Sequence, residues 1–241
     1  MKGARPLGLL AGAVVAHAGP GVLALPAVRR RVAPRLHGLG RPGHVALTFD
    51  DGPDPASTPR FLAELDRLGW KATFFMLGAL AHRSPGLTAE VAAAGHEVAV
   101  HGWTHVSHLA RRPGTVVDEV RRTRDTLGEV TGTAPRWLRP PYGVMSGGDL
   151  LAARSVGLRP VLWTTWGRDW TTEASAAGVA AEVLRGCGRD GAAGPTVLLH
   201  DSDCTSAPGS WRSAVGALSV LGEEWARRGW HVGRLSDHGL G

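Results

Sequence analysis

Two adjacent carboxylates, Asp50 and Asp51 in the sequence TFDDGP (48–53), are the residues of this chain best suited to chemistry. Negative charges this close repel each other unless a cation or a shared proton offsets the repulsion. The pair follows a buried-strand pattern, HVALTF (44–49), and precedes a Gly-Pro turn. We therefore expect both carboxylates at the C-terminal end of a strand, where βα folds place their chemistry. Taken alone, the motif also fits a capping aspartate followed by a turn aspartate.

Two histidines, His101 and His105 in HGWTH, follow the predicted strand EVAV (97–100). A separation of four puts both imidazoles on one face of a helical turn, which suits two ligands of one metal ion. The alternative is a solvated turn, and we expect His96 and His108 to have structural or solvated roles. One carboxylate with two histidines leaves metal positions open for water and substrate, and a second carboxylate can serve as general base.

Three further clusters follow other predicted strands: RPPYG (139–143), RDW (168–170) and LLHD (198–201). Arg139 can pair with an aspartate and fix its orientation, and the prolines can hold the Tyr142 N–H rigidly toward a site. A histidine such as His200 at a strand end suits acid or base work, and a nearby aspartate raises its pKa. Singly, these clusters also fit a structural Pro-Pro turn or ordinary loops.

Short apolar runs alternate with helical patterns along the chain and are expected to position these clusters. The strand candidates are 44–49, 71–76, 97–100, 136–138, 160–163, 196–199 and 231–235. The helical candidates are 85–94, 114–131, 148–156, 174–186 and 211–229, and a further helix in which Thr58 is the cap and Gly69 the end. Seven strands alternating with helices predict a parallel α/β fold, with the polar clusters gathered at one end of the strands.

The ordered set TFDDGP, HGWTH, RPPYG, RDW and LLHD resembles the five motifs of the polysaccharide deacetylases of the NodB homology type, carbohydrate esterase family 4. The resemblance covers roughly residues 44 to 235. It implies a distorted (β/α) barrel with about seven parallel strands. We accordingly expect a basic apolar leader over residues 1–43 and a NodB-like deacetylase domain over 44–241.

The resemblance also implies roles for individual residues. A divalent metal, most often zinc with cobalt or other ions as alternatives, would be bound by Asp51, His101 and His105. Asp50 would be the general base and His200 the general acid, with Arg139 holding Asp50 and Asp169 tuning His200. The Tyr142 backbone N–H would stabilise the oxyanion. The substrate would contact four residues: Pro140, Tyr142, Trp170 and Leu198. The chain departs from the family pattern at Gly102, where Ser or Thr is common, and at Trp166, where aspartate is frequent.

The implied activity is removal of acetyl groups from N-acetylglucosamine-type units of peptidoglycan or a chitin-like glycan, a hydrolysis of carbon–nitrogen bonds other than peptide bonds. One alternative keeps the chemistry on a small-molecule amide, a lipid-linked sugar or O-acetylated xylan. Another is a glycan-binding module without turnover, against which the complete set of base, acid and metal ligands argues. We expect a monomer whose partner is the acetylated glycan.

The positive charge belongs to the leader, because residues 1–41 hold seven of the 27 basic residues and none of the 21 acids. The rest of the chain carries −1, which argues against a nucleic-acid-binding body. Residues 7–27 are apolar and contain the small-residue triplet Ala16-His17-Ala18, as in a signal peptide, although the arginines that follow also suit a membrane anchor. We expect an exported or membrane-anchored protein, with a cytoplasmic domain as the alternative. Cys187 and Cys204 flank a strand and can form a disulfide if the protein is exported.

Overall fold

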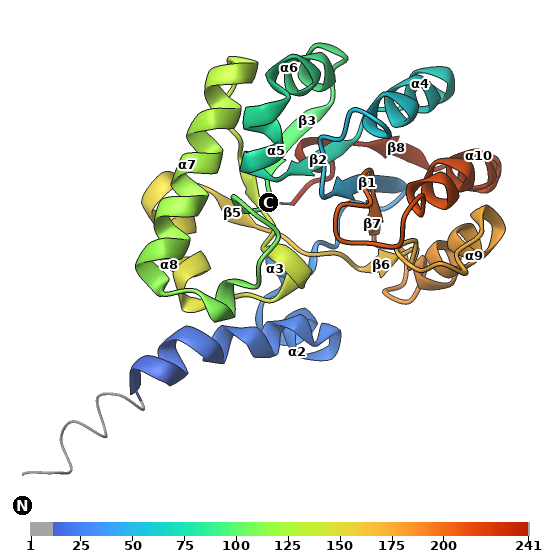
Figure 1. Cartoon of the computed structure of the whole chain (residues 1–241). Helices are drawn as coiled ribbons and strands as arrows, with labels where there is room; N and C mark the ends of the chain where they lie inside the picture. The colour runs from blue at the N-terminus through green and yellow to red at the C-terminus, as the bar shows by residue number, and fades with distance from the viewer. Residues whose placement is uncertain (1–11, 241) are drawn as a thin grey trace, which may run out of the picture.

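The computed structural model describes residues 12–240 and contains one eight-stranded sheet whose pairings are all parallel. Its strands are β1 (His44–Asp50), β2 (Thr73–Met76), β3 (Glu97–Val100), β4 (Trp137–Leu138), β5 (Arg159–Pro160), β6 (Thr165–Trp166), β7 (Thr196–His200) and β8 (His231–Gly233). The strand order is β5-β4-β3-β2-β1-β7-β6, and β8 pairs with β1. The sheet curls into an incomplete barrel surrounded by helices (Figure 1), which confirms the predicted fold class.

The helices of the barrel are α4 (Thr58–Leu68), α5 (Gly78–Arg83), α6 (Pro85–Ala93), α7 (Pro113–Thr131), α8 (Gly147–Val156), α9 (Ala176–Gly186) and α10 (Trp211–Arg227). Five of the predicted helices are confirmed to within two residues at each end. The predicted cap of α4 is wrong by one position, because Ser57 precedes the helix and Thr58 is its first residue. The Thr58 hydroxyl instead donates to Asp201, and Gly69 ends the helix in the left-handed conformation as expected.

Alternation along the strands divides the core into two clusters. In β1, Val45, Leu47 and Phe49 belong to the large cluster beneath the helices. Ala46 belongs to a smaller cluster, with Phe75, Ala99, Trp137 and Val161 among its members. This second cluster fills the barrel interior. Thr48 and Asp50 continue the inward-facing row of β1, so the strand delivers a buried carboxylate to the interior at its C-terminal end.

The barrel is interrupted between β5 and β6, the two ends of the sheet. Residues 161–164 link these strands without a helix. The predicted strand 160–163 is therefore wrong in its extent: the Val161 N–H still donates to Leu138, but the Leu162 N–H turns to Leu36. The Arg139 guanidinium fills the break and donates to the carbonyls of both Val161 and Leu162. A buried cation thus satisfies backbone groups that an unbroken sheet would pair.

The segment before the barrel packs against this break. It contains η1 (Gly19–Ala24), α2 (Pro26–Val32) and α3 (Pro34–His37). Leu36 joins Met145 and Leu162 in a small apolar cluster, and the Gly40 and Gly194 backbones are bridged. These contacts join residues 36–40 to the barrel, while the division of the chain at residue 43 remains a prediction.

Within residues 12–240 no helix is both long and apolar enough to cross a membrane. Part of the apolar stretch 7–27, residues 7–11, lies outside the described residues. The disulfide considered for Cys187 and Cys204 does not form: both thiols are free, the first buried and the second exposed.

Candidate active site

The five sequence clusters converge on a cavity of about 300 Å³ at the C-terminal ends of the strands. It is lined by Asp50, Asp51, His101, His105, Tyr142, Gly143, Trp163, Trp166, Trp170, Leu198, His200, Thr205 and Ser206. Of the predicted site residues, Arg139 and Asp169 lie behind this surface and contact two residues that line it. Pro140, predicted to contact the substrate, does not line the cavity either, since it is buried in the turn before Tyr142.

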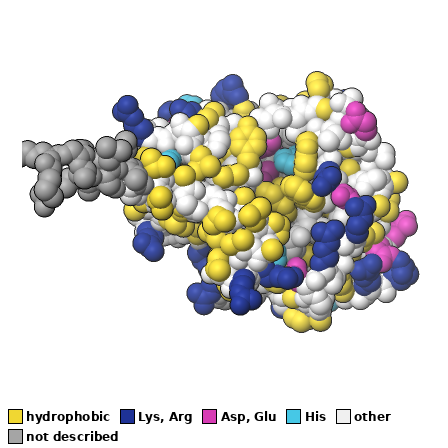
Figure 2. All heavy atoms as spheres, turned by 90° about the horizontal axis from the view of Figure 1, so that it is seen from below, with side chains coloured by type: hydrophobic (Ala, Val, Ile, Leu, Met, Phe, Trp, Pro, Cys, Tyr) yellow, Lys and Arg dark blue, Asp and Glu magenta, His cyan; other side chains and the backbone are white. Residues whose placement is uncertain are grey.

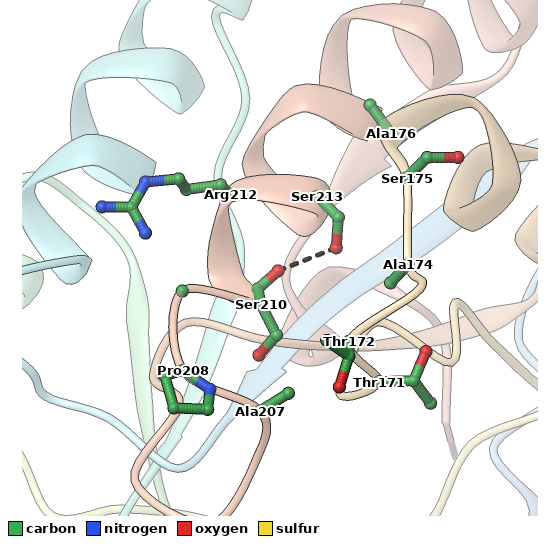
Figure 3. Close-up of a pocket in the computed structure, with 11 residues that line it drawn as sticks. Thr171, Thr172, Ala174, Ser175, Ala176, Ala207, Pro208, Ser210, Arg212 and Ser213 are labelled. Carbon is green, nitrogen blue, oxygen red and sulfur yellow. Dashed lines mark hydrogen bonds between the residues drawn. The ribbon is translucent and has the colours of Figure 1, made fainter.

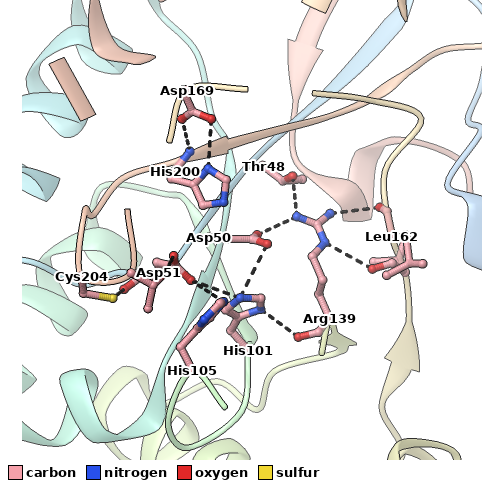
Figure 4. A network of polar contacts seen from close by, with 12 residues as sticks. Thr48, Asp50, Asp51, His101, His105, Arg139, Leu162, Asp169, His200 and Cys204 are labelled. Atoms are coloured by element: carbon pink, nitrogen blue, oxygen red, sulfur yellow. Dashed lines mark hydrogen bonds and ion pairs between the residues drawn. The ribbon is translucent and has the colours of Figure 1, made fainter. Parts of the chain in front are cut away.

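A carboxylate and two imidazoles form a compact set at one side of the cavity (Figure 4). The Asp51 Oδ1 atom lies 3.3 Å from Nε2 of both His101 and His105. The three ligand atoms lie within 4.8 Å of one another. Asp51 Oδ1 is buried and has no hydrogen-bond partner among the described residues. Nitrogen and carboxylate donors at this spacing fit a divalent cation.

Hydrogen bonds orient His101 as a ligand requires. Its Nδ1 lies 2.8 Å from the Arg139 carbonyl, which can only accept, so Nδ1 carries the proton and Nε2 faces Asp51. Burial lowers the pKa of His101, but the charges of Asp50 and Asp51 outweigh burial and raise it. Burial, together with the His101 charge, lowers the pKa of His105 to about 4, so this ring is neutral near pH 7.

The two histidines do not lie in a helical turn, contrary to the sequence-based expectation. Residues 101–107 form a bent loop, with Gly102 at a φ of +96°. The imidazoles nevertheless lie close together, with ring centroids 5.3 Å apart. His108 and His96 are both buried and structural: His108 Nδ1 contacts Asp149 at 2.6 Å, and His96 Nδ1 accepts from the Ala72 N–H.

Asp51 is held by groups on three sides. Burial raises its pKa, but the close contact with His101 and the charges of the surrounding histidines outweigh burial and hold the pKa well below its usual range. Its second oxygen accepts from the Thr205 hydroxyl at 2.8 Å. The backbone at Asp51 has a φ of +80°, and a Cβ at the following Gly52 would lie 2.3 Å from an Asp201 oxygen. Only glycine therefore fits after this carboxylate.

Asp50 is held in place by a buried ion pair with Arg139. Its Oδ1 accepts from Arg139 at 2.7 Å, and the same guanidinium donates to Thr48 at 2.8 Å. The Arg139 guanidinium also stacks on the Phe75 ring at 4.0 Å. The other carboxylate oxygen of Asp50 lies 3.7 Å from His101 Nε2. One oxygen is thus fixed by arginine, and the other faces the metal-ligand set (Figure 4).

His200 is bound twice by Asp169. The two carboxylate oxygens lie 3.0 Å from His200 Nδ1 and 2.7 Å from its backbone nitrogen. Burial lowers the pKa of His200, but the charges of Asp169, Asp51 and Asp50 outweigh burial and raise it to about 10. A protonated His200 therefore faces the cavity at neutral pH. The adjacent Asp201 does not contribute, because its carboxylate turns to Thr58.

Aromatic side chains form part of the cavity wall. Trp163 stacks on Trp166 with centroids 5.8 Å apart, and Trp166 meets Trp170 edge-on at 5.2 Å. Tyr142 is 58% exposed at the mouth and contacts His105, with its backbone in the left-handed region at φ +61°. A Cβ at Gly143 would lie 2.4 Å from the Trp163 ring. The face that Figure 2 shows carries histidine and acidic side chains recessed among hydrophobic ones.

Trp163, Thr205 and Ser206 line the cavity but were not predicted from the sequence. Trp163 is the last residue of the predicted strand 160–163 and could have been found as an aromatic beside the fourth motif. Nothing in the run SDCTSAPGS (202–210) distinguishes Thr205 from its neighbours.

A second cavity of about 320 Å³ lies between the N-terminal ends of α9 and α10 (Figure 3). Its walls are mainly small hydroxyl side chains, including Thr171, Ser175 and Ser210, and Arg212 is its one ionisable group. It therefore has no acid–base pair and no metal ligands.

Residues 38–161 match the family model for polysaccharide deacetylases. The chain is 36% identical over 163 residues to a peptidoglycan-N-acetylglucosamine deacetylase of Listeria monocytogenes, which covers 68% of this chain but only 33% of that protein. The chain thus spans about a third of the length of this relative. It is also 36% identical over 196 residues to a chitooligosaccharide deacetylase of Bradyrhizobium, covering 78% of this chain and 87% of that protein.

Among solved structures, the chain is similar to a family 4 acetyl xylan esterase from Clostridium thermocellum in complex with a cobalt ion. The TM-score is 0.68 at 29% identity, covering 80% of this chain and 88% of the esterase. This neighbour has the same fold and holds a cobalt ion.

Proposed function

The chain belongs to the polysaccharide deacetylase family, and from this we propose that it is a metal-dependent hydrolase that removes acetyl groups from N-acetylglucosamine-type units of a glycan, peptidoglycan or chitin-like. The observation that carries the proposal is one cavity with three parts: the set Asp51, His101 and His105, the arginine-bound Asp50, and the aspartate-bound His200. Together they supply metal ligands, a base and an acid for amide hydrolysis.

Asp51, His101 and His105 fit a divalent cation, because an unpartnered buried carboxylate oxygen faces two imidazole nitrogens. Histidine and carboxylate ligands suit zinc, and cobalt shares this preference. A cation bound there supplies a Lewis acid for the acetamide carbonyl and lowers the pKa of a water molecule. It also replaces the proton that the carboxylates otherwise favour on His101.

Asp50 is the general base in this proposal. Its Arg139-bound oxygen is fixed, and the other oxygen is free to accept a proton from the attacking water. Arg139 also keeps the carboxylate in one orientation, because it is itself held by Thr48 and two backbone carbonyls. An isosteric amide at position 50 would keep this geometry and lose the ability to accept a proton.

His200 is the general acid. Its high pKa keeps the imidazolium protonated near pH 7, and Asp169 holds Nδ1, which leaves Nε2–H to donate to the departing amine. The backbone N–H of Tyr142, in its left-handed turn, is proposed to donate to the developing oxyanion. Trp170 and Leu198 line the cavity and suit contact with the acetyl methyl group.

We further propose that the protein is exported and acts as a monomer. Peptidoglycan lies outside the cytoplasmic membrane, and the Listeria relative is named for it. A second substrate class, O-acetylated xylan, is favoured by the likeness to the xylan esterase. Ester cleavage requires the same metal and base but no protonated amine leaving group, so His200→Ala is expected to slow amide cleavage more than ester cleavage.

Acetate release from chitotetraose, peptidoglycan and acetylated xylan tests the proposal. The metal-loaded protein should release acetate from the two amide substrates, and chelation should abolish the release. Mass spectrometry should show a loss of 42 Da for each acetyl group removed, which is the mass difference between an acetamide and the free amine. A metal-loaded protein that releases acetate from none of the three glycans would refute the proposed function.

A further inference from the structure

A third cavity, of about 560 Å³, adjoins the active site, because Trp163 and Trp166 line both. It lies between α2, the β6 strand and α9, and contains five arginines and two acids: Arg29, Arg30, Arg168, Arg185, Arg189, Glu182 and Asp190. The acids are already engaged, since Asp190 pairs with Arg30 at 2.9 Å, and Glu182 pairs with Arg168 at 3.4 Å and also with Arg185. The arginines therefore leave an excess of positive charge in the cavity.

Arg29 gives this cavity a buried cation held by uncharged acceptors. It is 3% exposed, and its guanidinium donates to the carbonyls of Ala24 and Trp163 and to Nδ1 of His37. Burial and the charge of Arg29 lower the pKa of His37, so its ring is neutral and accepts the hydrogen bond without adding charge. A buried cation with neutral acceptors is stabilised when an anion approaches it.

The aromatic pair connects this charge to the catalytic cavity. Trp163 and Trp166 stack on each other, and Arg168 lies over Trp166 at 5.5 Å from its centroid. Flat aromatic faces pack against sugar rings, and guanidinium groups bind carboxylates and phosphates through paired hydrogen bonds. A glycan that crosses the tryptophan pair would reach the arginines from the site of deacetylation.

We propose that the arginine cavity is a subsite for an oxyanion, a carboxylate or a phosphate, on the saccharide next to the one that is deacetylated. The inference rests on the proposed function for the identity of the neighbouring sugar, and it assigns anionic glycans as the preferred substrate class. Cleavage of a signal peptide at the triplet 16–18 would leave the subsite intact, because Arg29, Arg30 and His37 all follow that triplet.

Binding of products that already lack the reacting acetyl group tests the subsite independently of turnover. Three disaccharides with glucosamine in the reacting position serve as probes: one whose neighbour is N-acetylmuramic acid, one whose neighbour carries a phosphate monoester, and one whose neighbour is N-acetylglucosamine. Isothermal titration calorimetry with the full chain should show at least one anionic probe binding about tenfold more tightly than the neutral probe at low salt, and less so at high salt. Whichever anionic probe binds more tightly shows whether the subsite prefers a carboxylate or a phosphate.

The double variant Arg185→Gln/Arg189→Gln removes two exposed charges of the cavity that lie outside the catalytic groups. It should weaken binding of the anionic probe about fivefold and change the neutral probe less than twofold. Arg121→Gln/Arg227→Gln, on the exposed faces of α7 and α10, is the matched control and should change neither.

Equal binding of neutral and anionic probes by the wild-type chain would overturn the subsite, as would equal weakening of both by the double variant. These results leave acetate release untouched. Conversely, selective binding of an anionic probe without acetate release from any glycan would refute the proposed deacetylase function and retain the anion site.

Discussion

Replacing Asp169 by asparagine should shift the pH dependence of turnover. In the wild-type chain both donors of His200, the ring Nδ1–H and the backbone N–H, find a carboxylate oxygen, at 3.0 and 2.7 Å. Asparagine keeps the shape but offers one acceptor oxygen and one NH₂ donor. One His200 donor therefore loses its acceptor, and the imidazolium loses its nearest negative charge.

The size of the effect follows from the pKa of His200, which is raised from 6.5 to about 10. The three carboxylates near it share this increase, and Asp169 contributes the largest part. An opposite charge at this distance changes a pKa by about 1–3 units, so Asp169→Asn should lower that of His200 by about two. The two proteins should then differ most clearly at one pH unit below the wild-type alkaline limit, where His200 is still mostly protonated in the wild type but mostly neutral in the variant. At that pH the activity of the variant relative to the wild type should be about tenfold lower than on the plateau. A cation bound at Asp51 lowers the pKa of His200 in both proteins. Both pH profiles therefore move to lower pH, and the pH difference between them is preserved.

The assay is kcat/KM for acetate release from chitotetraose between pH 6 and 11, with metal content measured on the same samples. Loss of the oriented acid should also lower the plateau by about 10- to 100-fold. Asp118→Asn, 77% exposed at the side chain on α7, is the matched control and should reproduce the wild-type profile. An Asp169→Asn enzyme with normal metal content and an unmoved alkaline limit would refute the assignment of His200 as an acid tuned by Asp169.

Three more outcomes are expected. Asp51→Asn should lose bound metal, whereas Asp50→Asn should keep it and lose turnover by at least about 100-fold, as measured by elemental analysis and acetate release; equal metal loss in both would contradict their separate roles. Chelation should lower the Tm by about 5–10 °C for metal supplied at 100 times its Kd, and Asp51→Asn should not respond to the chelator; a wild-type Tm that is indifferent to chelation would argue against the site. Arg139→Met should destabilise the fold by about 3–5 kcal/mol in urea unfolding, because it leaves Asp50 buried without its cation. Thr48→Val removes the hydrogen bond to the Val197 carbonyl and the one accepted from Arg139 but keeps the ion pair, so it should cost less, about 1–2 kcal/mol; equal losses would mean that the ion pair is unimportant.

Sequence patterns predicted the strand ends that bear chemistry better than they predicted the contacts made there. The strands 44–49 and 196–199 are confirmed because their apolar runs are long and sharply ended. The run 160–163 is equally apolar, yet the chain leaves the sheet after Pro160. The interruption depends on Arg139 and Leu36, which supply partners for the freed backbone from distant parts of the chain. No local pattern contains that information.

The choice between two aspartates shows the same limit. Asp201 is adjacent to His200 in sequence, and Asp169 is 31 residues away, yet only the distant one bonds the imidazole. Successive residues of a strand point to opposite sides, so the neighbour in sequence is directed away from the ring. Thr205 and the arginine cavity were likewise invisible, since they arise where loops and the leader meet the barrel.

The pairing of β1 with β7 sets Asp50 and His200 as directly opposed residues on neighbouring strands. Paired residues of parallel strands point to the same side, so the separation of these two groups is set by backbone hydrogen bonds of the sheet. Much of the wall that would select a substrate, by contrast, comes from segments beyond the strand ends, such as those that carry Tyr142, Trp163 and Trp170. Loop exchange between relatives should therefore transfer glycan preference while turnover persists, whereas a single-residue insertion within either strand should abolish turnover for every substrate.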